Sequence, residues 1–194
     1  SLVGSEMCIR DRIKGLHENI DKEGGKVSSI TNMINHVMEY PEDLKGKKVV
    51  VIGGGAVGLD VVEFFAARKA DISIVEMMDQ IGRDLDPVTK NDMKCQMKTH
   101  GVHQLTQTAL LEVKEHSFLV KGSDGSYELP FDYGFVCLGM RAKGQLYPQL
   151  LDAFADDDVE ILNIGDSQRA RRIIDGTMEG RNILYHLTQR GYLD

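Results

Sequence analysis

A glycine-rich turn between an apolar strand and a helix constrains the fold of this chain more than any other feature. Lys48–Ile52 (KVVVI) is a β-branched run of the kind found in buried parallel strands. The turn after it has the spacing Gly53-x-Gly55-x-x-Gly58, and a second apolar run (DISIVE) occupies residues 71–76. Strands joined through a helix in this way belong to the α/β class, so we expect a mainly parallel sheet covered by helices.

The spacing of the glycines is that of a dinucleotide-binding loop. The first glycine allows a tight turn, the second lets the backbone approach a pyrophosphate, and the third lets helix and strand pack closely. The start of the helix then offers free N–H groups and the positive end of its dipole to the phosphates. The residues of this loop predicted to bind a cofactor are Gly53, Gly54, Gly55, Ala56, Val57 and Gly58. The alternative is a glycine-rich turn with no ligand.

Glu76 ends the second apolar run, eighteen residues after Gly58. This is close to the spacing of about 20 residues at which an acidic side chain binds the adenosine ribose. A carboxylate there accepts hydrogen bonds from the ribose hydroxyls and repels a 2′-phosphate. Met77 and Met78 follow it in place of an arginine, which favours NADH over NADPH. Arg83 is near enough in the sequence to keep NADPH as the alternative.

The rest of the chain alternates predicted helices with short predicted strands. A helix is expected at residues 29–40, with Ile30, Ile34, Val37 and Met38 near one face. A second helix is expected to begin at Asp86-Pro87 and to end at Gly101. Short strands are expected at residues 102–106, 109–115, 117–121, 126–130 and 133–138, a loop at 145–158, a final strand at 159–164, and a long helix at 169–190.

Composition excludes several functional classes. The 194 residues carry a formal net charge of −7, and no basic cluster is present that would neutralise nucleic-acid phosphates. No apolar run approaches the roughly 20 residues that span a bilayer, and we expect a cytoplasmic protein. Cys8, Cys95 and Cys137 form no CxxC pair, which argues against a disulfide scaffold, a zinc site and a dithiol centre. We expect Cys95 and Cys137 to be buried apolar residues.

Two further clusters of side chains have competing interpretations. His100 and His103 have a spacing that would suit a metal site, but Gly101 ends the helix between them, so we expect solvent-exposed histidines. Cations at the start of the last predicted helix oppose its dipole, which indicates a partner for them. That partner is either a cofactor phosphate or acidic neighbours. The cluster consists of Arg169, Arg171 and Arg172.

Three sequence blocks give the chain a family resemblance. They are GGGAVGLD, IVEMMDQIGRDLDP, and IGDSQRARRII followed by EG, within about residues 44–187. The chain resembles the C-terminal FAD- and NAD(P)-binding region of multidomain NADH:flavin oxidoreductases related to old yellow enzyme, such as 2,4-dienoyl-CoA reductase and 2-enoate reductase. The resemblance implies a Rossmann-like three-layer ββα domain of the pyridine nucleotide-disulfide reductase type, with a β-meander and a remnant of an FAD domain.

The resemblance also implies a domain organisation. Residues 13–45 would be a linker or remnant of a preceding FAD domain, 46–142 the NAD(P)-binding domain, and 143–194 the C-terminal part of the FAD domain. Residues 1–12 resemble a translated sequencing adaptor and are expected to be non-native. The family's barrel, with its FMN and iron–sulfur cluster, and its first FAD loop have no counterpart in this sequence. FMN and the cluster are therefore expected only on a part that this chain does not contain.

The same resemblance assigns cofactor-binding roles outside the glycine loop. It places Gly139, Gly165 and Asp166 at the cofactors, with Asp166 at the ribityl–phosphate part of FAD. It places Asp60 near the nicotinamide, at a position where related reductases carry glutamate. After Gly139 this chain has Met-Arg-Ala (140–142) in place of the family's Arg-x-Pro-Asn.

The predicted function is the NADH-binding portion of an FAD-dependent oxidoreductase that reduces an enoate- or enoyl-type substrate on a missing barrel. The cofactors carry the chemistry of hydride transfer, so no catalytic residue is predicted. One alternative is the nucleotide-binding domain of another flavin disulfide-reductase-like enzyme, of the NADH oxidase or ferredoxin reductase type. Another is a non-catalytic module that binds NADH.

Overall fold

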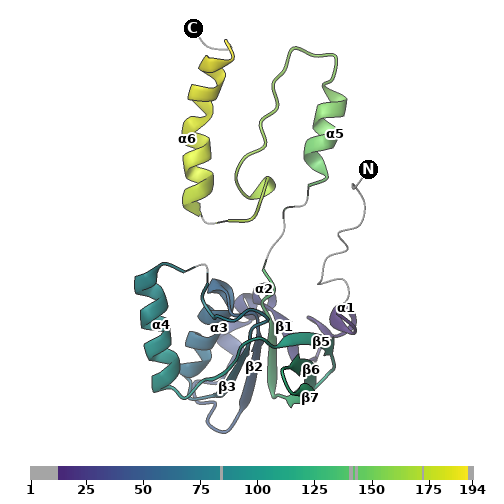
Figure 1. Ribbon diagram of the computed structural model, residues 1–194. Helices are drawn as coiled ribbons and strands as arrows, with labels where there is room; N and C mark the ends of the chain where they lie inside the picture. The colour runs from purple at the N-terminus through teal and green to yellow at the C-terminus, as the bar shows by residue number, and fades with distance from the viewer. Residues whose placement is uncertain (1–12, 84, 140–141, 143, 172, 192–194) are drawn as a thin grey trace. The chain divides into compact units, whose positions relative to one another are not determined.

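The protein has two compact units, residues 1–139 and residues 140–194 (Figure 1). A computed structural model describes residues 13–83, 85–139, 142, 144–171 and 173–191. The predicted adaptor peptide, residues 1–12, lies outside the described residues. Residues 13–45 lie in the first unit together with the glycine loop.

A five-stranded parallel sheet is the centre of the first unit. Its strands lie in the order β1-β8-β2-β3-β4, and every neighbouring pair is parallel. The strands are β1 (Val27–Ser29), β2 (Lys48–Ile52), β3 (Asp71–Val75), β4 (His103–Leu105) and β8 (Tyr133–Val136). The predicted α/β fold is therefore confirmed, and the glycine loop joins β2 to the helix that leads into β3.

Each face of the sheet packs on a different layer, because side chains alternate along a strand. Val49 and Val51 of β2 belong to the apolar cluster under the helices, whereas Val50 and Ile52 belong to the cluster on the opposite face. Figure 1 shows α3 and α4 on one side of the sheet and the antiparallel strands on the other. These elements are α3 (Ala56–Ala66), α4 (Pro87–Thr99), β5 (Ala109–Val113), β6 (Ser117–Gly122) and β7 (Gly125–Pro130). The three layers and the β-meander agree with the predicted fold class.

The helical side of the sheet is held by a cluster of aromatic rings. The ring of Tyr40 packs edge-on against those of Phe65 and Tyr133, at centroid distances of 5.1 and 5.7 Å. Phe65 also contacts Phe135 at 4.9 Å and is fully buried. Such aromatic pairs stabilise a core beyond the area they bury. The cluster joins α3, β8 and the segment before β2.

The segment before β2 differs from the predicted single helix at residues 29–40. Val27–Ser29 pairs with β8 as an edge strand, and the hydroxyl of Ser29 accepts from the Asn32 amide to begin α2 (Ile30–Asn35). The chain leaves helical geometry at His36 and continues as the 3-10 helix η2 (Val37–Glu39). The short helix α1 (Leu16–Asn19) lies earlier in the segment.

The predicted buried face of that helix is also wrong. Ile34 and Met38 are 62% and 92% exposed, whereas Met33 is buried and Ile30 packs beside it. Within α2 it is Met33 and not Ile34 that faces the core, and the end of the helix at His36 takes Met38 off the expected face. Tyr40, which is partly buried, packs against the core instead.

The α4 helix begins and ends where the sequence indicates. The carboxylate of Asp86 accepts from the amides of Val88 and Thr89, and Pro87 occupies the first helical position. The hydrogen bonds from Thr89, and then that from Val88, hold the pKa of Asp86 below its ordinary value. Gly101 has a φ of +67°, the left-handed conformation that ends many helices.

The second unit corrects three predictions. Residues 146–153 form the helix α5 (Leu146–Ala153) rather than a loop; Pro148 is tolerated there because it lies in the first turn. Residues 159–164 form no strand, because no described strand of this unit pairs with them. The last helix, α6 (Ile173–Gln189), begins later than expected. The 3-10 turn η3 (Gly165–Ser167) precedes it.

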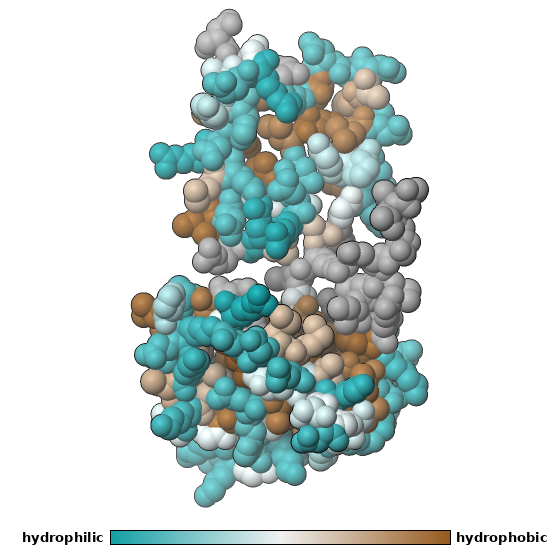
Figure 2. Space-filling view, viewed as in Figure 1, coloured by the Kyte–Doolittle hydropathy of each residue, from teal (hydrophilic) through white to brown (hydrophobic). Residues whose placement is uncertain are grey.

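None of the described residues of the second unit is buried. Ile173 is 91% exposed, and Leu184 and Tyr185 are exposed farther along α6. Figure 2 shows apolar side chains gathered on the surface of this unit. Burial of apolar side chains is what offsets the conformational entropy lost on folding, and the described part of this unit contributes no fully buried side chain.

Replacement of the buried Phe65 ring should lower the free energy of unfolding far more than replacement of an exposed side chain. Phe65→Ala is expected to reduce the free energy of unfolding of the first unit by about 3–5 kcal/mol, because it opens a cavity under the sheet. Met38→Ala, at an exposed site, is expected to change it by less than about 0.5 kcal/mol. Urea denaturation followed by circular dichroism measures both. Equal losses in the two variants would contradict this assignment of the core.

Candidate dinucleotide-binding site

The carboxyl ends of the parallel strands bring together residues that are far apart in the sequence. The glycine loop follows β2, Glu76 follows β3, and Gly139 lies three residues beyond the end of β8. The chain passes from β2 to β3 and β4 on one side and returns to β8 on the other. The strand order thus reverses next to β2, and open α/β sheets bind ligands outside the carboxyl ends at such a point.

The first and third glycines of the loop are required by close contacts. Gly53 has a φ of +107°, and a Cβ added there would lie 2.3 Å from the carbonyl oxygen of Cys137. A Cβ on Gly58 would lie 1.9 Å from the carbonyl oxygen of Gly53. Both positions therefore exclude any side chain, and the second contact packs the first turn of α3 directly on the loop. The predicted packing role of the third glycine is confirmed.

The second glycine faces open space. A Cβ on Gly55 would meet no heavy atom within 4 Å. Gly55 is also the residue that caps α3, and no side chain accepts a hydrogen bond from the start of that helix. The first-turn N–H groups, at Ala56 and Val57, have no acceptor four residues back within the helix. Free donors beside a bare backbone fit a pyrophosphate.

Glu76 connects the end of β3 to the glycine loop. Its Oε2 accepts from the Gly54 amide at 2.7 Å, and its Oε1 accepts from the Met78 amide at 2.8 Å. The carboxylate is thus fixed beside the loop, and each oxygen keeps acceptor capacity for a ribose hydroxyl. This position fits the predicted ribose-binding role. The backbone bonds of Glu76 could not be predicted from the sequence.

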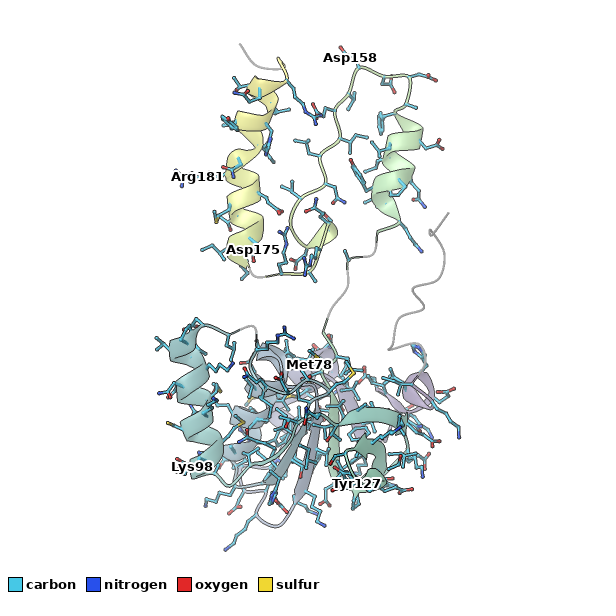
Figure 3. All side chains as sticks on the ribbon, viewed as in Figure 1. Met78, Lys98, Tyr127, Asp158, Asp175 and Arg181 are labelled. Atoms are coloured by element: carbon cyan, nitrogen blue, oxygen red, sulfur yellow. The ribbon has the colours of Figure 1, made fainter. Side chains whose placement is uncertain are left out.

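Two hollows share lining residues near Glu76, and the smaller of them adjoins the glycine loop. One has a volume of about 360 Å³ and the other about 700 Å³. Gly54, Gly55 and Glu76 line only the smaller hollow; Met77, Asp79 and Gln107 line only the larger; Met78, Gln80 and Arg83 line both. Met78 lies at the end of the sheet that carries the loop (Figure 3).

Gln80 and Gln107 line the hollows, and neither could be recognised as a lining residue from the sequence. Gln107 follows β4, and only the sheet order brings it to this edge. Its φ is +51°, and its amide donates to the Met78 carbonyl at 2.9 Å. A non-glycine residue in the left-handed region is uncommon and often marks a functional site.

Asp60 lies on α3 where its charge influences Cys137. Burial raises the pKa of Asp60, and the neighbouring Glu63 charge raises it further. Burial, followed by the charge of Asp60, raises the pKa of the Cys137 thiol to about 12. Asp60 lies in the first half of α3, the helix that begins directly after the glycine loop. The structure places it near the carboxyl edge of the sheet, and its predicted role at the nicotinamide stays a prediction.

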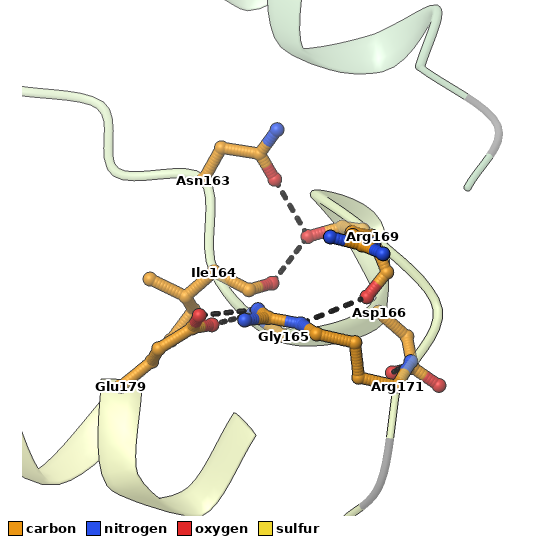
Figure 4. Close-up of polar contacts among 8 residues, drawn as sticks. Asn163, Ile164, Gly165, Asp166, Arg169, Arg171 and Glu179 are labelled. Atoms are coloured by element: carbon orange, nitrogen blue, oxygen red, sulfur yellow. Dashed lines mark hydrogen bonds and ion pairs between the residues drawn. The ribbon is translucent and has the colours of Figure 1, made fainter. Parts of the chain in front are cut away.

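Gly165 and Asp166 lie in the second unit, in a turn that its own side chains hold (Figure 4). The Gly165 amide donates to Glu179 Oε2 at 2.6 Å, and Arg171 forms an ion pair with the other oxygen of that carboxylate. These two contacts, the amide bond first, lower the pKa of Glu179. The carboxylate of Asp166 accepts a hydrogen bond from the Arg171 amide at 3.2 Å, so it closes the turn.

The basic cluster before α6 is only partly explained by acidic neighbours. Arg169 and Arg171 precede the helix instead of lying in its first turn, and Arg172 lies outside the described residues. Arg171 pairs with Glu179, which favours the ion-pair interpretation for that residue. The Arg169 side chain is exposed.

The remaining candidates have ordinary structural roles. Cys137 is buried as expected, but Cys95 is exposed on α4, so that prediction is wrong. The 3.6-residue period turns Cys95 outward while Met97 is buried. His100 and His103 are exposed, as expected. In the described part of the chain no three His, Cys, Asp or Glu side chains are grouped to hold a metal ion, and no helix has the length and apolarity to cross a membrane.

The sequence has relatives among multidomain reductases. A family model described as pyridine nucleotide-disulphide oxidoreductase matches residues 9–164. The bilirubin reductase of Mediterraneibacter gnavus is 30% identical over 81% of this chain and 24% of its own length. The metal reductase of Desulforamulus reducens is 28% identical over 71% of this chain and 24% of its own length. The NADH oxidase of Thermoanaerobacter brockii is 26% identical over 95% of this chain and 27% of its own length.

Solved structures share the fold at lower identity. A 2-naphthoyl-CoA reductase complex superposes with a TM-score of 0.67 at 19% identity, over 87% of this chain and 24% of that one. Histamine dehydrogenase from Rhizobium sp. 4-9 superposes with a TM-score of 0.66 at 17% identity, over 90% of this chain and 29% of that one. The chain spans about a quarter of the length of the curated relatives named above.

Alanine variants of Gly58 and Gly55 should differ, the first in protein stability and the second in affinity for NADH. Gly58→Ala places a methyl group on the Gly53 carbonyl and is expected to lower the free energy of unfolding by about 3 kcal/mol or more. Gly55→Ala meets no atom and should change it by less than about 1 kcal/mol. The same methyl group faces the expected pyrophosphate, so the affinity for NADH should fall about tenfold. Denaturation and calorimetric titration test both effects; unchanged NADH affinity in Gly55→Ala would contradict the site.

The two described cysteines should differ in reactivity. With its pKa raised to about 12, the Cys137 thiol stays protonated and inert to iodoacetamide at pH 8, while Cys95 is alkylated. Because the folded pKa lies above its ordinary value near 9, the stabilising contribution of this thiol is complete below pH 9 and declines as the pH rises toward 12. Peptide mapping by mass spectrometry, with Cys95→Ser as the control, measures the labelling. Rapid labelling of native Cys137 would contradict its burial.

Proposed function

The chain belongs to the pyridine nucleotide-disulphide oxidoreductase family, and we propose that it is the NADH-binding portion of an FAD-dependent oxidoreductase. The observation that carries the proposal is the open backbone at Gly55 beside the uncapped start of α3. A turn without a ligand would not need a bare backbone at that position. Glu76, fixed at the adjacent strand end, supplies the acceptor for the ribose and the negative charge that disfavours NADPH.

The residues of this chain bind and orient the cofactor rather than react with it. In the bound state, NADH supplies a hydride and FAD accepts it, so no protein acid or nucleophile is required. The first turn of α3 holds the pyrophosphate through its N–H groups and dipole. Glu76 would hold the ribose through its carboxylate oxygens. Asp60 and Gly139 are then the residues of this chain proposed for the nicotinamide end.

The proposed FAD contacts lie in the second unit. Glu179 and Arg171 hold the Gly165–Asp166 turn, and Asp166 itself is exposed. A preformed turn with an exposed carboxylate fits a hydroxyl-rich ribityl chain, because a carboxylate accepts hydrogen bonds from hydroxyl groups. We assign the C-terminal part of an FAD domain to residues 143–194. Its exposed apolar side chains agree with a unit that is covered in the complete protein.

The proposed overall reaction is reduction of an enoate- or enoyl-type substrate on a barrel domain with FMN and an iron–sulfur cluster. The support is the resemblance of the three sequence blocks, together with the quarter-length match to larger reductases. An NADH oxidase-type reaction is the second candidate. It is favoured by one observation, the alignment of an NADH oxidase with 95% of this chain.

Titration and turnover assays test the proposal. The 194-residue chain is expected to bind NADH at least about tenfold more tightly than NADPH in calorimetric titrations. It should not oxidise NADH alone, whereas a longer chain with a preceding FAD-binding region should do so when FAD is added. NADH binding without oxidation by either form would indicate a non-catalytic module. Absence of NADH binding would contradict the whole proposal.

A further inference from the structure

Two consecutive methionines follow Glu76 at the edge of the sheet that carries the glycine loop. Met78 lines both hollows, and Met77 lines only the larger. Among the described residues that line the hollows, every other side chain is polar or charged, apart from the glycines, which have none. Met77 is 53% exposed and Met78 is 39% exposed. Solutes can therefore reach both thioethers, and the proposed function uses neither of them.

The backbone of Met78 is held at both of its polar groups. Its amide donates to Glu76 Oε1 at 2.8 Å, and its carbonyl accepts from the Gln107 amide at 2.9 Å. Glu76 directly follows β3 and Gln107 lies just after β4, so these bonds tie Met78 to two strand ends. The side chain therefore stays beside the smaller hollow, although its thioether can still change rotamer.

The adenosine half of a dinucleotide would bring an aromatic ring to Met78. The adenine is attached directly to the ribose, and the ribose is proposed to lie at Glu76. Met78 is the methionine that shares the smaller hollow with Glu76. An aromatic base has apolar faces, and a thioether sulfur makes favourable contacts with such rings. Met78 thus supplies the apolar side chain against which the base can pack.

We infer that Met78 is an oxidation site, and that its conversion to the sulfoxide by hydrogen peroxide weakens binding of the dinucleotide. The inference rests on the proposed function, because it requires the adenosine to lie beside Glu76. In this reaction the sulfur lone pair attacks one peroxide oxygen and the O–O bond breaks. The transferred hydroxyl gives its proton to the departing hydroxide. Methionine is thereby oxidised by two electrons to the sulfoxide, and the peroxide is reduced to water.

The sulfoxide should oppose binding because it replaces an apolar surface with a polar one. The aromatic base loses its contact with the sulfur, and the new oxygen must be stripped of water when the base packs on it. Conversely, a bound base covers Met78 and should slow its oxidation. Two methionines outside the hollows set the limits of the reaction. Met38 is 92% exposed and should oxidise freely, whereas Met97 is buried and should stay reduced.

The test uses ADP-ribose, which carries the adenosine half and has no dihydronicotinamide to react with peroxide. The 194-residue chain is titrated calorimetrically before and after treatment with hydrogen peroxide, and peptide mapping by mass spectrometry measures the sulfoxide at each methionine. Oxidation should weaken ADP-ribose binding about tenfold in the unmodified chain. Leucine has a similar volume and forms no sulfoxide, so the affinity of Met78→Leu should change less than about twofold on treatment.

Matched variants separate Met78 from the other oxidisable side chains. Met77→Leu and Met38→Leu should each still lose about tenfold in affinity on treatment, because both keep Met78. The exposed Cys95 is common to all variants, so its oxidation cancels in the comparison. Bound ADP-ribose should slow sulfoxide formation at Met78 at least about fivefold and leave the rate at Met38 unchanged. Treatment with methionine sulfoxide reductases should restore the affinity.

Each result decides the inference. Unchanged affinity after full conversion of Met78, or an equal loss in Met78→Leu, would overturn it while the proposed NADH site stands. Resistance of native Met78 to peroxide would also overturn it. If the unmodified chain binds neither ADP-ribose nor NADH, the proposed function fails and the inference with it. If Met78→Leu alone does not bind, the protection measurement decides, and equal oxidation rates at Met78 with and without ADP-ribose would contradict the inference.

Discussion

The approach of Gly58 to the carbonyl of Gly53 brings α3 against the end of β2 more closely than any side chain would allow. The start of the helix, its uncapped N–H groups and the open face of Gly55 all depend on this contact. Glu76 also fixes the loop, because its carboxylate accepts a hydrogen bond from the Gly54 amide. A ligand at this edge thus meets a backbone whose geometry is already fixed, and preorganisation of this kind lowers the entropic cost of binding.

The same loop organises the charges around the site. Glu76 is held by two backbone amides, and Arg83 follows a buried pair whose backbone bonds to Gly54. Glu76 and Arg83 therefore line the smaller hollow next to the loop, and Asp79 adds a second acidic side chain at the larger one.

The two units of the chain differ in how they are stabilised. The first has apolar clusters on both faces of its sheet, with fully buried aromatic rings such as Phe65 and Phe118. The second has no buried residue in its described part, and polar contacts around Glu179 hold its turn instead. Hydrogen bonds and surface ion pairs contribute little net stability. The first unit therefore has a hydrophobic core of its own, whereas the described part of the second has none.

The sequence by itself determined the parts of this protein that rest on local geometry. The glycine spacing, the β-branched run of β2 and the Asp86-Pro87 start of α4 each have one favoured backbone solution, so the βαβ unit and the cofactor class could be predicted. Tertiary structure decided what depends on partners distant in the chain. A strand requires a neighbour, which residues 27–29 have in β8 and residues 159–164 lack. Likewise Gln107 reaches the site only through sheet order, and the backbone bonds of Glu76 exist only once β3 lies beside the glycine loop.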